Sequence, residues 1–310
     1  MKENLRKERL SQGILSLLFI CGSTADRSAV CDGVNMNIAI LSGKGGTGKT
    51  TVSTNLALIL GVSYVDCDVE EPDGFIFLNP PIQKREDVFV EYPVIDPEKC
   101  ALCGSCAKVC QFHALAKAGR RITVFEKLCH DCGACKLVCN AGALSYEKRS
   151  IGKLEGGITK RISCVRGILN VGEPMAVPVI RKVLGGLSKE DHFIDCPPGT
   201  SCSVVNTLKY ADAAILVTEP SRFGLHDLLM AVELVKLNHI PYGIIINKDD
   251  EKDNLIKSFC KENVITLLGT IPYKKSAAAI YSKGNMLCED EFYKKIFLSI
   301  AGKIKEAFAW

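Results

Sequence analysis

The sequence lacks the features of several large protein classes. No uninterrupted apolar run approaches the ~18 residues that a membrane-spanning helix needs, which excludes an integral membrane protein. Charge of one sign is also scarce: 39 basic and 35 acidic residues leave a net charge of only +4, too small and too dispersed to indicate nucleic-acid binding. With 47% hydrophobic and 24% charged residues, the 310-residue chain is neither disordered nor fibrous, and it can form one or two globular domains.

Cysteine, in contrast, is abundant, with 16 residues in the chain. Residues 1–35 combine a charged start with an apolar patch at 13–21, but no small-residue cleavage site follows cleanly. We therefore expect a cytoplasmic protein whose cysteines bind metal rather than form a disulfide framework. We interpret residues 1–35 as a leader that is disordered or that results from a start codon assigned too far upstream.

Half of the cysteines form two copies of the pattern C-x2-C-x2-C-x3-C. The first copy consists of Cys100, Cys103, Cys106 and Cys110, and the second, 29 residues later, of Cys129, Cys132, Cys135 and Cys139. Thiolates at these spacings suit an iron–sulfur cubane, in which three nearby sulfurs are joined by a fourth from elsewhere. A pair of zinc sites is the alternative, because spaced cysteines also bind zinc. The duplication of the whole pattern favours clusters.

Residues 94–148 resemble a bacterial two-cluster ferredoxin, a small α+β domain. The resemblance implies crossed ligation of two [4Fe-4S] clusters, one by Cys100, Cys103, Cys106 and Cys139 and the other by Cys129, Cys132, Cys135 and Cys110. Gln111 and Asn140 stand where the ferredoxin pattern has proline. We expect this departure to alter the surroundings of the clusters, since all eight thiolates are kept.

A second motif lies upstream of the cysteines. The apolar residues 36–41 lead into SGKGGTGKTT, and residues 43–50 fit the phosphate-binding pattern G-x4-G-K-[ST] between a strand and a helix. Lys49 is expected to neutralise the β- and γ-phosphates, Thr50 to bind Mg²⁺, and the start of the helix to face the anion. The expected nucleotide-binding residues here are Gly43, Lys44, Gly45, Gly46, Thr47, Gly48, Lys49, Thr50 and Thr51.

The additional lysine, Lys44, makes this loop resemble the deviant Walker A motif of the MinD, ParA and nitrogenase-iron-protein ATPases. The resemblance implies that Lys44 contacts phosphates at or near the interface of an ATP-dependent homodimer. It also implies that Asp68 orients the attacking water and that Asp195 holds Mg²⁺ through water. Asn247 matches the family residue that hydrogen-bonds adenine, and Pro272 matches a loop beside the base. Catalytic roles would fall to Lys44, Lys49, Asp68 and Asp195.

These residues follow near-continuous apolar runs. Such runs are typical of parallel strands buried on both faces, so we expect a doubly wound, mostly parallel α/β sheet with the site at the carboxyl ends of its strands. The resemblance to the ATPases covers residues 36–93 and 149–310, and the ferredoxin-like residues 94–148 are inserted between them. Pro80, Pro81 and Pro93 are expected to stiffen the connectors.

On both motifs, the chain is identified as a member of the MinD-superfamily ATPases with an inserted ferredoxin domain, which are often labelled cobyrinic acid a,c-diamide synthase-like. This implies ATP hydrolysis to ADP and phosphate, coupled to electron transfer or metal-cluster assembly, with a redox or cluster-accepting protein partner. A cobyrinate-type amidoligase is a weaker alternative, because only 37 residues follow Tyr273 and a glutaminase domain needs more. A MinD-like spatial organiser is another, but it would leave eight cluster ligands unused.

Two further positions limit where cluster chemistry can occur. Pro198 replaces the cysteine that holds the intersubunit cluster of the nitrogenase iron protein, and no C-terminal C-x2-C pair is present. Any cluster chemistry would then use residues 94–148. An amphipathic helix is expected over residues 292–310. We interpret it as a helix packed on the sheet rather than a membrane anchor.

Overall fold

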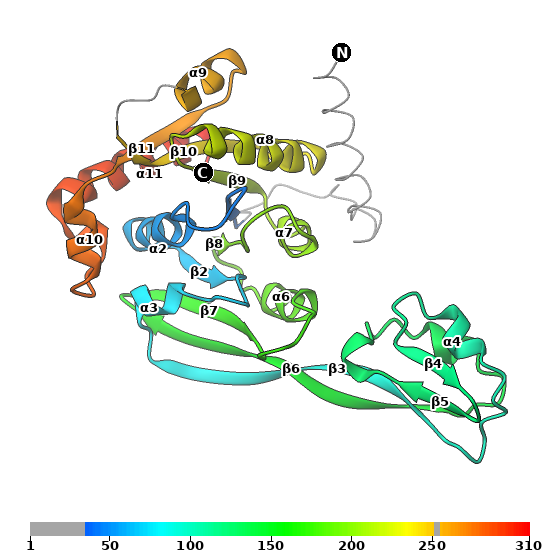
Figure 1. The fold of residues 1–310 in the computed structure, drawn as a ribbon. Helices are drawn as coiled ribbons and strands as arrows, with labels where there is room; N and C mark the ends of the chain where they lie inside the picture. Colours follow the sequence, from blue (N-terminus) through cyan, green and yellow to red (C-terminus); the bar gives the residue numbers. More distant parts are fainter. Residues whose placement is uncertain (1–34, 251–254) are drawn as a thin grey trace, which may run out of the picture.

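The computed structural model describes residues 35–250 and 255–310, so the prediction of a leader falls almost wholly outside the described residues. The described chain forms one nine-stranded sheet with helices on both faces. A long two-stranded ribbon extends from one edge of the sheet and carries the cysteine-rich segment (Figure 1). No helix of the described residues is both long enough and apolar enough to cross a membrane.

The central strands are parallel and occur in the order β11-β10-β9-β1-β8-β2-β7. Their apolar residues are buried on both faces, and residues 38–41 of β1 are fully inaccessible. This confirms the predicted doubly wound, mostly parallel sheet. The strands are β1 (Asn37–Leu41), β2 (Ser63–Asp66), β7 (Ile162–Leu169), β8 (His192–Asp195), β9 (Ala213–Thr218), β10 (Tyr242–Asp249) and β11 (Leu267–Pro272).

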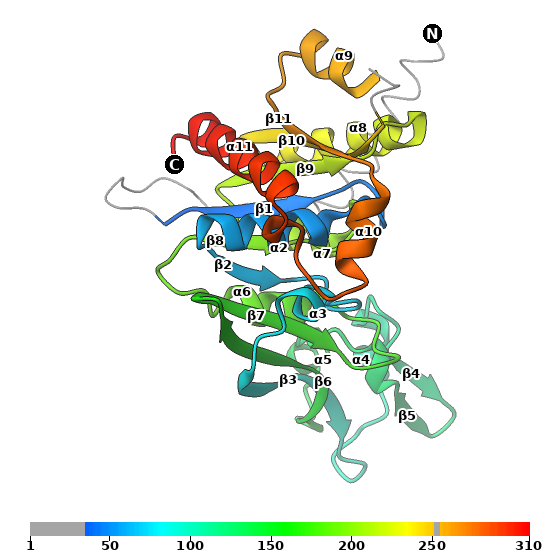
Figure 2. The ribbon, with the colours of Figure 1, turned by 90° about the vertical axis from the view of Figure 1, so that its left-hand side faces the viewer.

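Two groups of helices cover the sheet. One face, turned to the viewer in Figure 2, packs against α2 (Lys49–Leu60), α3 (Gly74–Leu78), α10 (Lys275–Tyr281), the 3-10 helix η2 (Leu287–Glu289) and α11 (Glu291–Phe308). The other face packs against α6 (Val177–Leu184), α7 (Cys202–Leu208), α8 (Arg222–Leu237) and α9 (Leu255–Glu262). Alternate residues of β1 contact the two groups: Ile38 and Ile40 contact the first, and Ala39 and Leu41 the second.

The last helix, α11, packs on the sheet as predicted. Its buried residues Tyr293, Phe297, Ile300 and Ile304 join the core that contains α2 and β11. Asp290 caps the helix by accepting hydrogen bonds from the first-turn amides. The apolar face is therefore occupied within the chain.

The ribbon consists of β3 (Ile82–Ile95) and β6 (Leu144–Thr159), which pair antiparallel from Ile82–Gly157 to Ile95–Leu144. β6 also pairs antiparallel with β7 and so extends the parallel sheet. Both strands run through the expected domain junctions at 93/94 and 148/149. The cysteine-rich segment is thus joined to the nine-stranded sheet by paired strands.

The cysteine-rich segment contains α4 (Ser105–Val109), β4 (Leu115–Ala118), β5 (Arg121–Val124), the 3-10 helix η1 (Glu126–Leu128) and α5 (Ala134–Leu137). Its backbone repeats the 29-residue period of the sequence. Six of its left-handed residues form three pairs one period apart: Leu102 and Asp131, Gly104 and Gly133, and His113 and Gly142. Gly104 and Gly133 each precede one of the short helices. The duplication seen in the cysteines is therefore also a duplication of local structure.

Candidate functional site

The phosphate-binding loop joins β1 to α2. Gly46 and Gly48 have φ angles of 77° and 87°, a region that favours glycine. A Cβ atom on Gly48 would lie 2.0 Å from Asn247 Nδ2, so no larger residue fits there. Gly48 gives α2 no side-chain cap, which leaves the first-turn amides of the helix open to an anion.

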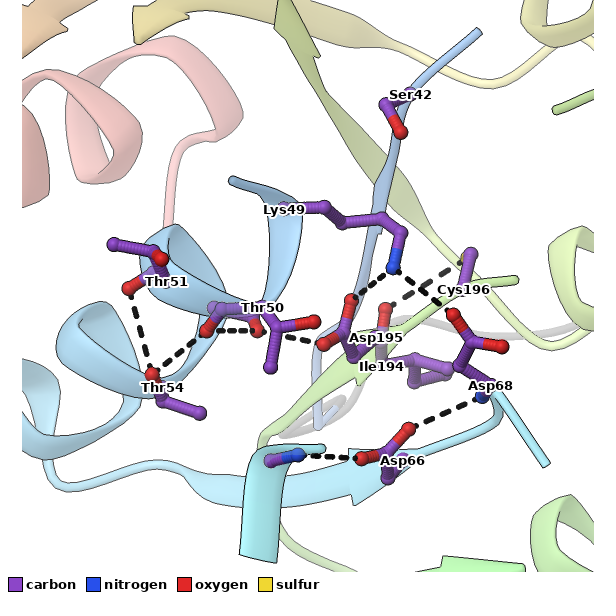
Figure 3. Close-up of polar contacts among 12 residues, drawn as sticks. Ser42, Lys49, Thr50, Thr51, Thr54, Asp66, Asp68, Ile194, Asp195 and Cys196 are labelled. Carbon is purple, nitrogen blue, oxygen red and sulfur yellow. Dashed lines mark hydrogen bonds and ion pairs between the residues drawn. The ribbon is translucent and has the colours of Figure 1, made fainter. Parts of the chain in front are cut away.

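Lys49 lies among carboxylates at the centre of the site (Figure 3). Its Nζ is 3.0 Å from Asp195 Oδ1 and 3.6 Å from Asp68 Oδ2, and the lysine side chain is only 7% exposed. Burial alone would lower the pKa of Lys49, but the charges of Asp195 and Asp68 outweigh it and raise this pKa above its ordinary value. The side chain is a fixed positive charge at the position where phosphates are expected.

Asp68 has an environment different from that of Asp195. Burial raises the pKa of Asp68 to about 6 against the lowering effect of Lys49, and the nearby charge of Asp195 adds to the rise. A carboxyl group with a pKa near 6 changes its protonation close to neutral pH. This property suits a residue that positions water or accepts a proton.

Asp195 is held by residues that sequence reasoning did not identify. Ser53 Oγ donates to Asp195 Oδ2 at 3.1 Å, and the Tyr64 hydroxyl lies 3.0 Å from the same oxygen. The Tyr64 hydroxyl is also 3.1 Å from Asp66 Oδ2, whose carboxyl accepts the amide of Gly74. Burial and the charge of Asp195 raise the pKa of Asp66 well above its usual value. Since a phenol has one proton, the Tyr64 hydroxyl can donate to only one of these two carboxylates at a time.

The two expected magnesium ligands, Thr50 and Asp195, lie near Lys49. Thr50 lies in the first turn of α2, and Asp195 ends β8 (Figure 3). The nearby Thr47 Oγ1 is buried without a hydrogen-bond partner among the described residues. A phosphate oxygen would supply the missing partner, and hydroxyl and carboxylate oxygens are the donors that Mg²⁺ prefers. These residues therefore fit Mg²⁺ and a nucleotide phosphate.

The other residues predicted for the nucleotide site have different partners and do not all contact the carboxylates around Lys49. Lys44 forms an ion pair with Glu219, which follows β9, and does not join the carboxylates around Lys49. Asn247 is buried and donates from Nδ2 to the Thr47 carbonyl at 2.8 Å, so it supports the loop. Its contact with adenine stays a prediction. Pro272 ends β11, which pairs with the strand that carries Asn247.

The loop has further contacts that the motif does not reveal. Lys248 donates to the Gly46 carbonyl at 2.7 Å, and Glu219 lies 4.0 Å from the Lys248 ammonium. These contacts depend on how β9 and β10 meet the loop. The only sequence signal for them is the position of both residues at or just after apolar runs.

The eight cysteines of the two C-x2-C-x2-C-x3-C runs line two separate cavities. The first, of about 220 Å³, is lined by Cys100, Cys103, Cys106 and Cys139 with apolar neighbours such as Ile95 and Ile122. The second, of about 10 Å³, is lined by Cys110, Cys129, Cys132 and Cys135. The grouping is the one implied by crossed ligation, in which each run lends its fourth cysteine to the other site. The narrow second cavity would accept a cluster only if its four sulfurs spread.

The two cavities differ in exposure and in hydrogen bonding to sulfur. In the second, three cysteines are buried and only Cys132 is exposed, whereas in the first none is buried. The Ala114 amide donates to Cys110 Sγ at 3.3 Å, a contact that suits a thiolate. Within residues 35–250 and 255–310, no three Cys, His, Asp or Glu side chains are grouped as ligands of a single metal ion. The first cavity leaves space between its four sulfurs, whereas the second leaves almost none.

Comparison with known proteins decides the family. Residues 38–287 match the model of the CobQ/CobB/MinD/ParA nucleotide-binding domain. The chain belongs to this family. The family resemblance expected from the loop is thereby confirmed, and the chain is a nucleotide-binding P-loop protein of the MinD/ParA type.

Individual proteins are also similar to this chain. An uncharacterized protein of Methanocaldococcus jannaschii is 33% identical over 257 residues, which cover 80% of this chain and 90% of the relative. An iron-sulfur cluster carrier protein of Pyrococcus horikoshii is 25% identical, with 86% and 84% covered. The septum site-determining protein MinD of Pyrococcus horikoshii, solved with Mg-ADP, shares the fold with a TM-score of 0.56 and 18% identity, over 88% of this chain and 97% of that one.

Proposed function

We propose that this protein is an ATP-hydrolysing switch that controls the transfer of electrons, or of metal clusters, through two [4Fe-4S] centres. The carrying observation is that two sets of four cysteines surround separate cavities at the end of a ribbon that belongs to the ATPase sheet. Clusters held there would accept and release single electrons at low potential. Similarity to iron-sulfur cluster carrier proteins supports the broader link to clusters.

In this proposal the nucleotide site works through side chains that are already close together. Lys49 would exchange its carboxylate partners for the β- and γ-phosphates, which frees Asp195 to hold Mg²⁺ together with Thr50. Asp68 would orient the attacking water, helped by a pKa near 6. Thr47 Oγ1 would donate to a phosphate oxygen. The products would be ADP and phosphate.

A chain of contacts supports coupling between the two parts. The Gly74 amide is bonded to Asp66, and the next residue, Phe75, lies under the Arg166 guanidinium, with Cζ 4.6 Å from the ring centre. Arg166 donates to the buried Glu155 on β6 at 2.6 Å. β6 continues to the cysteine-rich segment. A movement of the residues around Asp66 on ATP binding would thus have a route to the ribbon.

The family resemblance adds an ATP-dependent homodimer to the proposal, with Lys44 near its interface. Lys44 is paired with Glu219 in the single chain, with the lysine side chain 34% exposed. Dimerisation would therefore exchange an existing partner of Lys44 for a phosphate. A protein that accepts electrons or clusters would be the second partner, and it would bind near the more exposed first cavity.

Metal analysis of anaerobically purified protein tests the cluster part of the proposal. We expect about eight iron and eight sulfide per chain, and about four of each in Cys132→Ala. Cys202→Ala is the matched control, because Cys202 lies outside both sets and is only partly exposed. Its iron content should equal that of the unmodified chain. Stoichiometric zinc without labile sulfide would refute the proposal.

A further inference from the structure

Two tyrosines of the ribbon pack against the core of the cysteine-rich segment, and their hydroxyls have different partners. The Tyr146 hydroxyl, on β6, lies 3.1 Å from Cys135 Sγ. The Tyr92 hydroxyl, on β3, donates to the Glu147 carboxylate at 2.9 Å. Tyr92 and Tyr146 are on paired strands, where Tyr92 is opposite Glu147 and Tyr146 is opposite Pro93. They form a natural pair of test and control residues.

We propose that Tyr146 donates a hydrogen bond to the Cys135 thiolate and raises the reduction potential of the cluster at Cys110, Cys129, Cys132 and Cys135. This rests on the proposed function, which supplies the cluster. A thiolate that binds iron has no proton, so the phenol must be the donor. The hydrogen bond withdraws negative charge from the sulfur and so stabilises the reduced form, which carries one more electron.

The surroundings of Tyr146 strengthen this effect. Cys135 is buried, and hydrogen bonds to charged groups are stronger where water is excluded. The Lys136 ammonium lies 5.5 Å from the centre of the Tyr146 ring, so a positive charge lies close to the donor side chain. The backbone of Tyr146 is fixed by the pairing of β6 with β3. Tyr146 therefore acts as a positioning residue that links the ATPase sheet directly to one cluster site.

The first cavity offers a weaker counterpart. Ser105 Oγ lies 3.5 Å from Cys103 Sγ, and Cys103 is exposed. Water competes with such a contact, so the Ser105 hydroxyl should change the potential of its cluster less than Tyr146 changes the other. The two clusters are thus expected to respond to different single substitutions.

Redox titration followed by electron paramagnetic resonance tests the assignment. In Tyr146→Phe, one of the two reduction waves should move to a more negative potential while the other stays in place. Tyr92→Phe should leave both waves unchanged, and Ser105→Ala should move only the wave that Tyr146→Phe leaves alone, by a smaller amount. If Tyr146→Phe moves neither wave, or moves both equally, the proposal is wrong.

A second measurement does not depend on the stability of Tyr146→Phe. Tyrosine labelled with ¹⁷O at the hydroxyl should show a hyperfine coupling to a reduced cluster in the unmodified chain, and the same coupling in Tyr92→Phe. Its absence in a cluster-loaded protein would overturn the role of Tyr146. Absence of iron and sulfide from the unmodified chain would instead refute the proposed function, so the two failures are distinguishable.

Discussion

Arg166 Nη2 donates a hydrogen bond to Glu155 Oε2 at 2.6 Å and so connects β7 with β6. Arg166 is on β7, directly opposite Asp66 of β2 at the nucleotide site. Glu155 is on β6, which reaches the cysteines at its other end. In the proposed function, this partly buried ion pair is the point at which a change around the phosphates would reach the ribbon.

The first prediction concerns this ion pair. Arg166→Gln should remove the effect of nucleotide on cluster potential while leaving both clusters in place. Arg85→Gln is the matched control, because Arg85 also pairs with Glu155, at 3.1 Å, but projects from the outer strand β3 and is 68% exposed. Arg85→Gln should retain the nucleotide effect. Equal behaviour of the two variants in redox titrations would remove Arg166 from the route.

Lys49→Ala should abolish Mg·ATP binding or reduce turnover by about 100-fold or more, because the loop would lose its fixed positive charge. Asp68→Asn should keep nucleotide binding and lose hydrolysis, since it removes only the group that positions water. Calorimetry of ATP binding and phosphate release measured on the same preparations separate the two effects. Similar losses of binding in both variants would contradict this division of roles.

The pH dependence of hydrolysis should report Asp68. Its raised pKa of about 6 means that the carboxylate form is lost as the pH falls through about 6, so kcat/KM should decrease on the acidic side. The residual activity of Asp68→Asn should lack this acidic limb. A full acidic limb in Asp68→Asn would assign the titration to another group.

Lys44→Ala should slow hydrolysis and weaken ATP-dependent dimerisation together, as the family resemblance implies. Glu219→Gln should have the opposite effect on association, because it releases Lys44 from its ion pair within the chain. Sedimentation with a non-hydrolysable ATP analogue measures both. If Lys44→Ala keeps full turnover and dimerisation, Lys44 has no role at the site.

Features that depend on local spacing are the ones that the sequence predicts best. The glycines around Lys49 form the phosphate loop from a few neighbouring residues, and the first three cysteines of each run lie together for the same reason. The fourth cysteine of each cavity comes from the other run, and only the ferredoxin resemblance implied it. The network of Tyr64 with Asp66 and Asp195 depends on the register between β2 and β8, which no local pattern specifies.

The ribbon shows the same limit more clearly. β3 pairs with β6 across the whole cysteine-rich segment, and residues 82–86 of β3 are polar or exposed, so this stretch resembles a connector. Pro93 suggested a stiff linker, yet it lies within β3, where an outer strand tolerates a residue without an amide proton. The segments predicted as linkers are therefore paired strands, β3 and β6, which join the cysteine-rich segment to the nine-stranded sheet.

The central claim is that the nucleotide state and the clusters are energetically coupled. Redox titration of the fully loaded protein, with Mg²⁺ and either ADP or a non-hydrolysable ATP analogue, tests it most directly. Coupling of about 1 to 3 kcal/mol corresponds to a shift of about 40 to 130 mV for one electron. By reciprocity, reduction must change ATP affinity by the same free energy, a factor of about 5 to 150. We predict such a shift in at least one wave and none in Lys49→Ala. Superimposable curves with the two nucleotides would contradict the account. They would mean that the cysteine-rich segment is attached to the nucleotide-binding part without being energetically coupled to it.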